Sequence, residues 1–236
     1  MNRNNRIRYL IFLILAILFI LFKYNDYIRE EESENNQIES YEVSSIPDYS
    51  GKDVIILNNN EPEFDDLSHT TESFEVYGEL DSLGRCTAAY ANIGKDLMPT
   101  SSRDRISEVK PTGWQYSKYD FIEGNYLYNR CHLIAYSLTA ENANPKNLIT
   151  CTRYTNATLM QEYENKVGNY IRKTSNHVLY RVTPIFDGSN LIAKGVQMEA
   201  LSIEDNGKGI KFNIFVYNIE PKIEIDYKTG DNHLKK

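Results

Sequence analysis

The sequence predicts an α+β domain in which an amphipathic helix accompanies a mainly antiparallel β-sheet. Three observations support this fold class. The chain of 236 residues contains 18 tyrosines and many valines and isoleucines, which favour strands. Its last third holds three apolar-rich runs separated by turn-forming residues, at 177–186, 191–202 and 210–218. Over residues 153–173 apolar side chains recur every three or four positions, which indicates a helix.

Other strands are expected nearer the amino terminus, followed by a long irregular segment. Residues 99–119 contain Pro99, Pro111 and Gly113, which interrupt regular structure. The same segment is locally basic and is therefore a candidate path for a polyanion. The additional strands are expected at residues 53–57, 74–80, 85–91 and 223–225.

Composition divides the chain into three segments. Residues 1–23 combine a basic start with an uncharged apolar run, a pattern shared by signal peptides and membrane anchors. No small-residue cleavage site follows, which favours an uncleaved single-pass anchor, with a secreted form as the alternative. Residues 24–45 are acidic and lack periodicity, as in a flexible linker. Residues 46–236 form the expected folded, extracytoplasmic domain.

The acidity of the chain belongs to the linker region. The formal net charge is −7, but the excess of acidic residues lies within residues 24–66, and residues 67–236 are neutral as a whole. The overall charge therefore does not exclude a nucleic-acid partner for the folded domain.

The three cysteines are Cys86, Cys131 and Cys151. They are too few and too scattered to indicate a disulfide framework or a zinc cluster. We therefore expect them to be unpaired and to pack as small apolar side chains.

Residues 126–170 hold the reactive groups of the chain. Residues 126–134 and 147–152 are predicted to be strands, separated by a polar loop and followed by the amphipathic helix. Arg130 and His132 lie on one face of the first strand, because strand side chains alternate, while Cys131 points to the other face. A near-neutral base beside a fixed cation is suited to phosphodiester hydrolysis.

Asn156 and Glu164 are candidate partners on the helix. They lie eight residues apart in the sequence, about 80° around an α-helix, so both can face one groove. Asn156 stands near the expected start of the helix, where asparagine also serves well as an N-cap. From the residues alone, Asn156 is either a helix cap or a metal ligand.

Several short motifs together resemble the DNA/RNA non-specific endonucleases, particularly the DNA-entry nuclease type of the ββα-metal, or His-Me finger, superfamily. The similarity extends from about residue 46 to residue 234 and implies a ββα-metal core set on the antiparallel sheet, with flanking helices. The motifs are Asn129-Arg130-Cys131-His132, Asn144-Pro145-Lys146-Asn147-Leu148-Ile149-Thr150, Arg153-Tyr154-Thr155-Asn156 and Tyr163-Glu164.

This resemblance implies a role for each matching residue. His132 would be the general base that activates water, and Asn156 the one direct protein ligand of a hydrated Mg²⁺, with Mn²⁺ as a substitute. Glu164 would hold a water of that ion. The substrates would be DNA and RNA, cut without sequence preference to leave 5′-phosphates, and no inhibitor partner is identified. The residues expected to bind the phosphate or support the site are Arg103, Arg105, Lys110, Arg130, Asn147 and Arg153.

The first motif departs from the commonest family form, Asp-Arg-Gly-His. Asn129 replaces its aspartate, which removes a charge that could orient Arg130 or His132, and Cys131 replaces its glycine. A first alternative is therefore a nucleic-acid-binding surface protein of the same fold with weakened catalysis. The others are an exported cysteine hydrolase, using Cys131 or Cys151 with a histidine, and a purely structural exported β-rich domain.

Overall fold

The computed structural model describes residue 23 and residues 40–41, 43–64 and 70–236. The expected anchor and most of the expected linker lie outside these residues. The chain divides into two units, Met1–Glu39 and Ser40–Lys236, and the second contains the fold described below. Among the described residues, no helix has the length and apolar character needed to cross a membrane.

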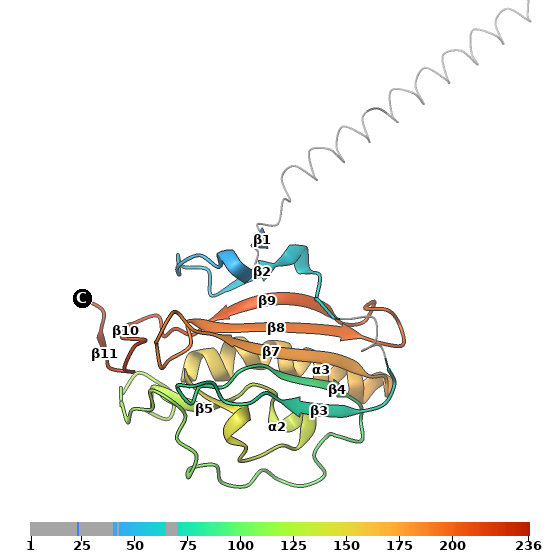
Figure 1. Ribbon diagram of the computed structural model, residues 1–236, viewed down its shortest axis with the longest axis horizontal. Coiled ribbons are helices and arrows are strands. Elements are labelled where there is room, and N and C mark those ends of the chain that lie inside the picture. Colours follow the sequence, from blue (N-terminus) through green and yellow to red (C-terminus); the bar gives the residue numbers. More distant parts are fainter. Residues whose placement is uncertain (1–22, 24–39, 42, 65–69) are drawn as a thin grey trace, which may run out of the picture. The chain divides into compact units, whose positions relative to one another are not determined.

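A seven-stranded sheet forms the centre of the second unit, in the order β1-β2-β9-β8-β7-β4-β3 (Figure 1). All neighbouring strands are antiparallel except β1 and β2, which are parallel. The strands are β1 (Ser40–Tyr41), β2 (Val54–Leu57), β3 (Phe74–Tyr77), β4 (Ala89–Ile93), β7 (Val178–Ile185), β8 (Gly195–Ser202) and β9 (Lys211–Tyr217). The predicted α+β class with a mainly antiparallel sheet is confirmed.

Most predicted strands are present with shorter bounds. The run at 85–91 corresponds to β4, which begins at Ala89 because Arg85 is used in a turn, where its backbone nitrogen donates to the Asp81 carboxylate. Two strands were not predicted. β1 precedes the expected start of the domain at residue 46, and β11 (Asn232–Leu234) pairs with β10 (Ile223–Ile225) in a small separate sheet.

A second small sheet carries the predicted reactive stretch. β5 (Tyr128–His132) pairs with β6 (Leu148–Thr152) in antiparallel register. The connection contains a short helix, α2 (Tyr136–Thr139), and a 3-10 turn, η4 (Pro145–Asn147). Two further 3-10 turns, η1 (Val43–Ser45) and η2 (Asn58–Asn60), flank β2.

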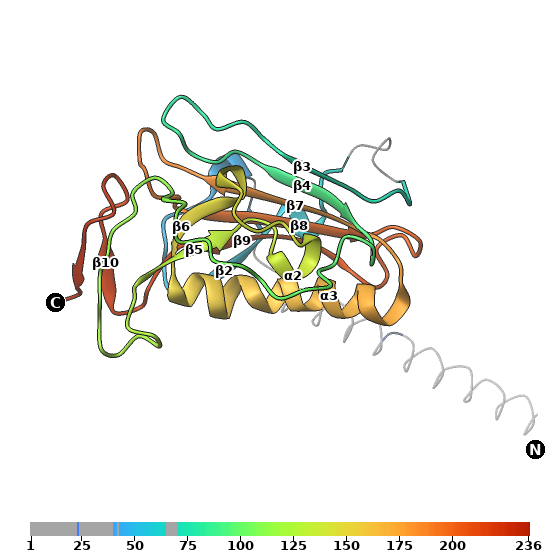
Figure 2. The same cartoon turned by 90° about the horizontal axis from the view of Figure 1, so that it is seen from below.

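The predicted helix is continuous but begins with a wide turn. η5 (Thr155–Met160) is π-helical and leads directly into α3 (Gln161–Thr174). This helix lies along one face of the main sheet, with β5 and β6 beside its amino-terminal end (Figure 2). Its side chains Val167 and Ile171 are fully buried in a core shared with Tyr180 of β7 and Met198 of β8. The hydrophobic effect therefore fixes the helix against the sheet.

The cysteine prediction was wrong for two of the three residues. Cys131 of β5 and Cys151 of β6 form a disulfide across a Cα–Cα distance of 5.9 Å. The β5–β6 register pairs residue 131 with Ile149 and residue 151 with Asn129, so the two cysteines are diagonal neighbours on the buried face. Cys86 is free and buried, and burial raises the pKa of its thiol to about 11.

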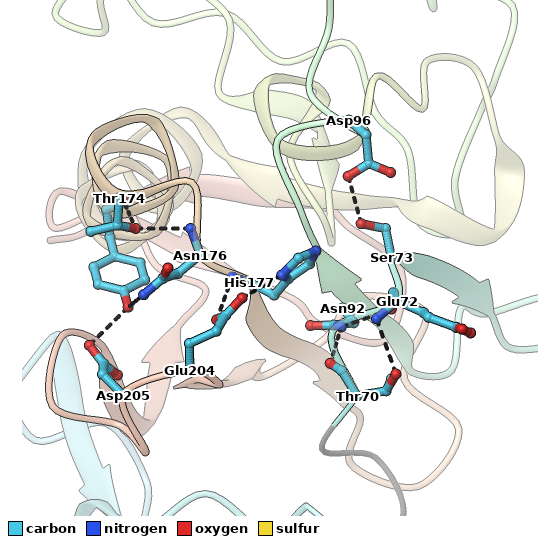
Figure 3. Close-up of polar contacts among 11 residues, drawn as sticks. Thr70, Glu72, Ser73, Asn92, Asp96, Thr174, Asn176, His177, Glu204 and Asp205 are labelled. Carbon is cyan, nitrogen blue, oxygen red and sulfur yellow. Dashed lines mark hydrogen bonds and ion pairs between the residues drawn. The ribbon is translucent and has the colours of Figure 1, made fainter.

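The carboxyl-terminal end of α3 is held by polar contacts among residues that we call the closed cluster: Tyr170, Asn176, His177, Glu204 and Asp205. Figure 3 labels the last four of them. The Tyr170 hydroxyl donates to Asp205 Oδ2 at 2.8 Å and accepts from the Asn176 side-chain nitrogen at 2.9 Å. His177 Nδ1 lies 2.7 Å from Glu204 Oε1. These contacts join the end of the helix to the turn between β8 and β9.

Candidate active site

A pocket of about 1140 Å³ lies beside the β5–β6 sheet and the first turns of the helix. Six of the predicted site residues line it, so β5, β6 and the helix bring together side chains that are far apart in the sequence. Those six are Arg103, Arg130, His132, Arg153, Asn156 and Glu164. The lining also includes aromatic side chains from residues 114–128 and from the start of α2.

His132 ends β5 and is only 5% exposed. Its Nε2 lies 2.7 Å from the backbone carbonyl oxygen of Asn142. A carbonyl oxygen can only accept, so Nε2 carries the proton and Nδ1 keeps a lone pair. Burial lowers the pKa of His132, with a further lowering by the nearby Arg103 charge, and the Asn142 hydrogen bond opposes it. The imidazole is therefore neutral near pH 7 and able to accept a proton.

Asn147 holds the chain just beyond His132. Its side-chain oxygen accepts from the Ile134 backbone nitrogen at 2.9 Å, and its side-chain nitrogen donates to the Ile134 carbonyl at 3.0 Å. The side chain is fully buried and is not part of the pocket lining. Asn147, expected to bind substrate or to support the site, has its amide engaged with the backbone of the segment that follows β5.

Arg130 lines the same pocket as His132, as strand alternation predicted. Its guanidinium group lies 4.1 Å from the centre of the Trp114 ring. It donates to two backbone carbonyls of the preceding loop, those of Ser107, at 2.9 Å, and Val109. These contacts fix a permanent positive charge at the pocket wall.

Asn156 lies inside the π-helical turn and is not a helix cap. The helical residues begin at Arg153, and the residue before them, Thr152, accepts from the Thr155 backbone nitrogen through its hydroxyl at 3.0 Å, as an N-cap does. The Asn156 side-chain nitrogen donates to Asn129 Oδ1 at 3.4 Å. Asn156 lines the pocket. Because its amide nitrogen is bonded to Asn129, its amide oxygen remains available to accept from, or to ligate, another group.

Glu164 lies two helical turns further along the same pocket. Burial raises the pKa of its carboxyl group to about 8. Burial, and after it the Glu164 charge, raises the pKa of the Tyr180 hydroxyl in the core. The side chain is nevertheless half-exposed at the pocket, and a carboxylate in so weakly polar a setting favours a positive partner.

The basic residues divide into pocket and surface groups. Arg103 is exposed at the pocket, while Arg105 and Lys110 are exposed outside its lining. Arg153 lines the pocket and pairs with Glu123 at 2.9 Å. The Nε atom of Arg153 is buried and has no hydrogen-bond partner within the described part of the chain.

Two features of the site were missed by the sequence analysis. One is the Asn142 carbonyl that fixes the His132 tautomer, which no side-chain pattern reveals. The other is the group of aromatic side chains at the pocket, among them Trp114, Tyr116 and Tyr126. Their positions follow from the folding of residues 114–128 against the carboxyl-terminal segment, which cannot be deduced from spacing.

The donor groups of the pocket fit a hard divalent cation. An amide oxygen and a carboxyl group are oxygen donors, which Mg²⁺ prefers, and so few protein ligands suit an ion that retains several waters. Among the described residues, no three His, Cys, Asp or Glu side chains form a ready-made metal cage. The residues therefore fit a mostly hydrated Mg²⁺ better than a fully protein-bound metal.

The fold is that of a nuclease, as comparison with known proteins shows. The family described as DNA/RNA non-specific endonuclease matches residues 66–203. The chain belongs to this family, whose members are hydrolases. A deoxyribonuclease of Streptococcus dysgalactiae subsp. equisimilis is 27% identical over 202 residues. The match covers 68% of this chain and 61% of the length of that relative.

Solved structures show the same fold. NucA from Streptococcus agalactiae with a bound magnesium ion has a TM-score of 0.70 and 23% identity, and the match covers 82% of this chain and 92% of NucA. The Sda1 nuclease with a bound zinc ion has a TM-score of 0.57 and 28% identity, with coverage of 69% and 80%. A divalent cation is thus present in both of these similar proteins.

Proposed function

We propose that this protein is an exported endonuclease that hydrolyses phosphodiester bonds of DNA, and also of RNA, without sequence specificity. It uses a divalent cation, Mg²⁺ with Mn²⁺ as a substitute, and leaves 5′-phosphate ends. Membership of the endonuclease family supports the reaction class. The arginines at the pocket support contacts to phosphates, which carry no sequence information.

The observation that carries the proposal is the tautomer of His132. Its Nε2 is bound to the Asn142 carbonyl, in a pocket that Asn156 and Glu164 also line. Nδ1 is therefore the basic atom, and it takes a proton from the attacking water. The water oxygen forms a bond to phosphorus while the bond to the 3′ oxygen breaks, so the phosphate stays on the 5′ end.

The arginines stabilise the charge that develops on the phosphate. Arg130 is held in place by Trp114 and two loop carbonyls, so little reorganisation is needed when substrate binds. Arg103 and Arg153 line the same pocket, and their guanidinium groups are suited to phosphate oxygens. Arg105 and Lys110, outside the pocket lining, attract the neighbouring phosphates through solvent.

Asn156 and Glu164 would hold the cation. The amide oxygen of Asn156 would be the direct ligand, and the Glu164 carboxylate would bind one of the waters on the ion. When bound, Mg²⁺ supplies Lewis-acid stabilisation of charge at the phosphate. Asn129 orients the Asn156 amide by accepting a hydrogen bond from it. Compared with the aspartate that is commonest in the family at this position, asparagine keeps the acceptor oxygen and lacks the negative charge.

The test of the function is degradation of plasmid DNA and of RNA by the purified full chain, with and without EDTA. We expect cleavage of both that stops on chelation, and products that a ligase accepts because they carry 5′-phosphates. Tight binding without cleavage would instead favour the catalytically weakened binding protein. Cleavage that persists in EDTA would contradict the metal requirement.

The orientation of Asn156 has a separate test. Asn129→Ala removes the acceptor for the Asn156 amide, so more Mg²⁺ should be needed for half-maximal activity. Asn129→Asp keeps the acceptor and adds negative charge, so less Mg²⁺ should be needed. Equal Mg²⁺ requirements for both variants would show that Asn129 does not act through Asn156.

Export rests on the amino-terminal pattern and on the disulfide. Residues 1–23 have the composition of an anchor, and the Cys131–Cys151 disulfide is of a kind that persists in oxidising compartments. We place residues 46–236 outside the cell, with residues 24–45 as the linker to a membrane anchor. Recovery of the protein in the membrane fraction, and its loss from that fraction without residues 1–23, tests the anchor. Recovery only in the medium would favour the secreted form.

A further inference from the structure

Two tyrosines form an exposed aromatic rim on the pocket. Tyr116 is 68% exposed and Tyr126 is 45% exposed, and both line the pocket together with the catalytic candidates. Large aromatic side chains are normally buried, so two exposed rings at a polar pocket indicate a binding surface. The reaction proposed above uses neither ring.

The rim stands on a rigid support. Residues 114–128 form a hairpin. In it the backbones of Lys118 and Tyr126 form an antiparallel β-bridge, and the Leu127 backbone nitrogen donates to the Ser117 carbonyl at 3.0 Å. The hairpin is fixed to the carboxyl-terminal segment, where the Tyr128 hydroxyl donates to the Gly230 carbonyl at 2.8 Å. Figures 1 and 2 show this part of the chain beside β10. A prearranged surface loses little conformational entropy when a ligand binds.

Cations accompany the rings. The Lys118 ammonium group lies 4.8 Å from the centre of the Tyr126 ring. The Tyr116 ring packs edge-on against Trp114 with ring centres 5.8 Å apart, and Arg130 lies over Trp114. Interaction with Arg130 also lowers the pKa of the Tyr116 hydroxyl. Aromatic rings that can stack on bases thus lie next to cations that can bind phosphates, as in proteins that bind single-stranded nucleic acid.

We propose that Tyr116 and Tyr126 stack on unpaired bases next to the scissile phosphate, so that single-stranded nucleic acid is preferred over duplex. The inference rests on the proposed function, because it assigns the substrate class of the same pocket. Bases within a duplex are already stacked and paired, so they reach the rings only after the strand opens. Stacking tolerates any base, which agrees with cleavage that lacks sequence specificity.

The experiment measures binding by the full chain carrying His132→Ala, so that substrate is not consumed. Fluorescence anisotropy in Mg²⁺ buffer compares a labelled single strand of DNA, the same strand with abasic sites, and the duplex. We expect the intact single strand to bind most tightly. Adding Tyr116→Leu and Tyr126→Leu should weaken its binding at least about tenfold, because each stacked base contributes about 1–3 kcal/mol. Binding of the abasic strand and the duplex should stay within about twofold.

Two matched controls isolate stacking from other effects. Tyr116→Phe with Tyr126→Phe keeps the rings and should retain tight binding to the single strand. Phe121→Leu removes an exposed aromatic residue of the same hairpin that does not line the pocket, and it should change nothing. A fluorescent base analogue in the strand should be quenched by the rim with tyrosines and not by the rim with leucines.

Two outcomes would contradict the proposed stacking by the rim, and both can be distinguished from a failure of the proposed nuclease function. Equal loss of affinity for intact and abasic strands would show that the tyrosines act on phosphates or on folding. Unchanged affinity of the leucine variant would show that they do not contact the strand. Because the measurement is of binding, it decides the role of the rim even if the protein with His132 cleaves nothing.

Discussion

The two ends of the helix formed by η5 and α3 are built in opposite ways. At the amino-terminal end a wide π-helical turn places Asn156 and Glu164 at an open pocket. At the carboxyl-terminal end Tyr170, Asn176 and Asp205 satisfy one another in the closed cluster. Polar groups left available at one end are suited to binding, while those paired at the other end stabilise the fold.

The two histidines at these ends differ in the same way. His132 lines the pocket and gives one ring nitrogen to a backbone carbonyl, while its other ring nitrogen keeps a lone pair. His177 has Nδ1 bound to the Glu204 carboxylate, and its backbone nitrogen also donates to Glu204. The residue type therefore does not decide the role, and the partner of each ring does.

The largest expected effect is on catalysis at the open end. His132→Ala should lower kcat/KM for DNA cleavage at least about a hundredfold, the lower range for loss of a general base. His177→Ala is the matched control and should retain activity within about threefold while losing thermal stability. Steady-state cleavage assays and melting curves of both variants check this. Similar losses of activity in the two would break the contrast between the histidines.

The disulfide behind the open end should make the next largest contribution, to stability. It closes a loop with a sequence separation of 20 residues, which corresponds to about 3 kcal/mol. Urea unfolding with and without a phosphine reductant should show this difference in the free energy of unfolding. The Cys131→Ser and Cys151→Ser double variant should be insensitive to reductant. A reductant effect that persists in that variant would assign it to another group.

Glu164 should act against stability in the metal-free protein. Its pKa in the folded state is raised to about 8 from 4.5, so between these values the folded state binds more protons than the unfolded state. The contribution of Glu164 to the free energy of unfolding is therefore most favourable below pH 4.5, and it becomes less favourable as the pH rises towards 8. Glu164→Gln removes this loss and should raise the free energy of unfolding at pH 9 by about 2 kcal/mol relative to wild type. This is less than the full pKa shift implies, because water in the pocket screens the charge.

Melting curves of wild type and Glu164→Gln at pH 4 and pH 9 test this expectation. The two proteins should differ little at pH 4, where the carboxyl group is protonated in both states. The variant should also cleave DNA more slowly, because an amide binds a hydrated cation less well than a carboxylate. A variant that is less stable than wild type at pH 9 would contradict the assigned cost of burial.

The smallest effect is expected at the closed end. Tyr170→Phe removes the hydroxyl that joins Asp205 to Asn176 and should cost about 1 kcal/mol of unfolding free energy. Cleavage should be unchanged at temperatures where the variant is folded. Urea unfolding and an activity assay on the same preparation check this. A loss of activity without a loss of stability would mean that the closed end is coupled to the pocket.

Local periodicity accounts for what could be predicted. The two-residue period of a strand placed Arg130 and His132 at one pocket, and the helical spacing of apolar residues located the helix. The disulfide could not be predicted, because it depends on the register between β5 and β6. The contact of Asn156 with Asn129 likewise depends on how the helix approaches that sheet. The short strands β1 and β11 have too few residues for a periodic signal.

The wide turn at Thr155–Met160 makes the length of this segment critical. Removing one residue from it would rotate everything after it by about 100° relative to the preceding strand. Glu164 would then leave the pocket, or Val167 and Ile171 would leave the core. Insertions and deletions should therefore be tolerated in the surface loops of this protein. Within Thr155–Met160 they should disrupt the pocket or the core, because the number of residues in this turn sets the direction in which the later helical side chains point.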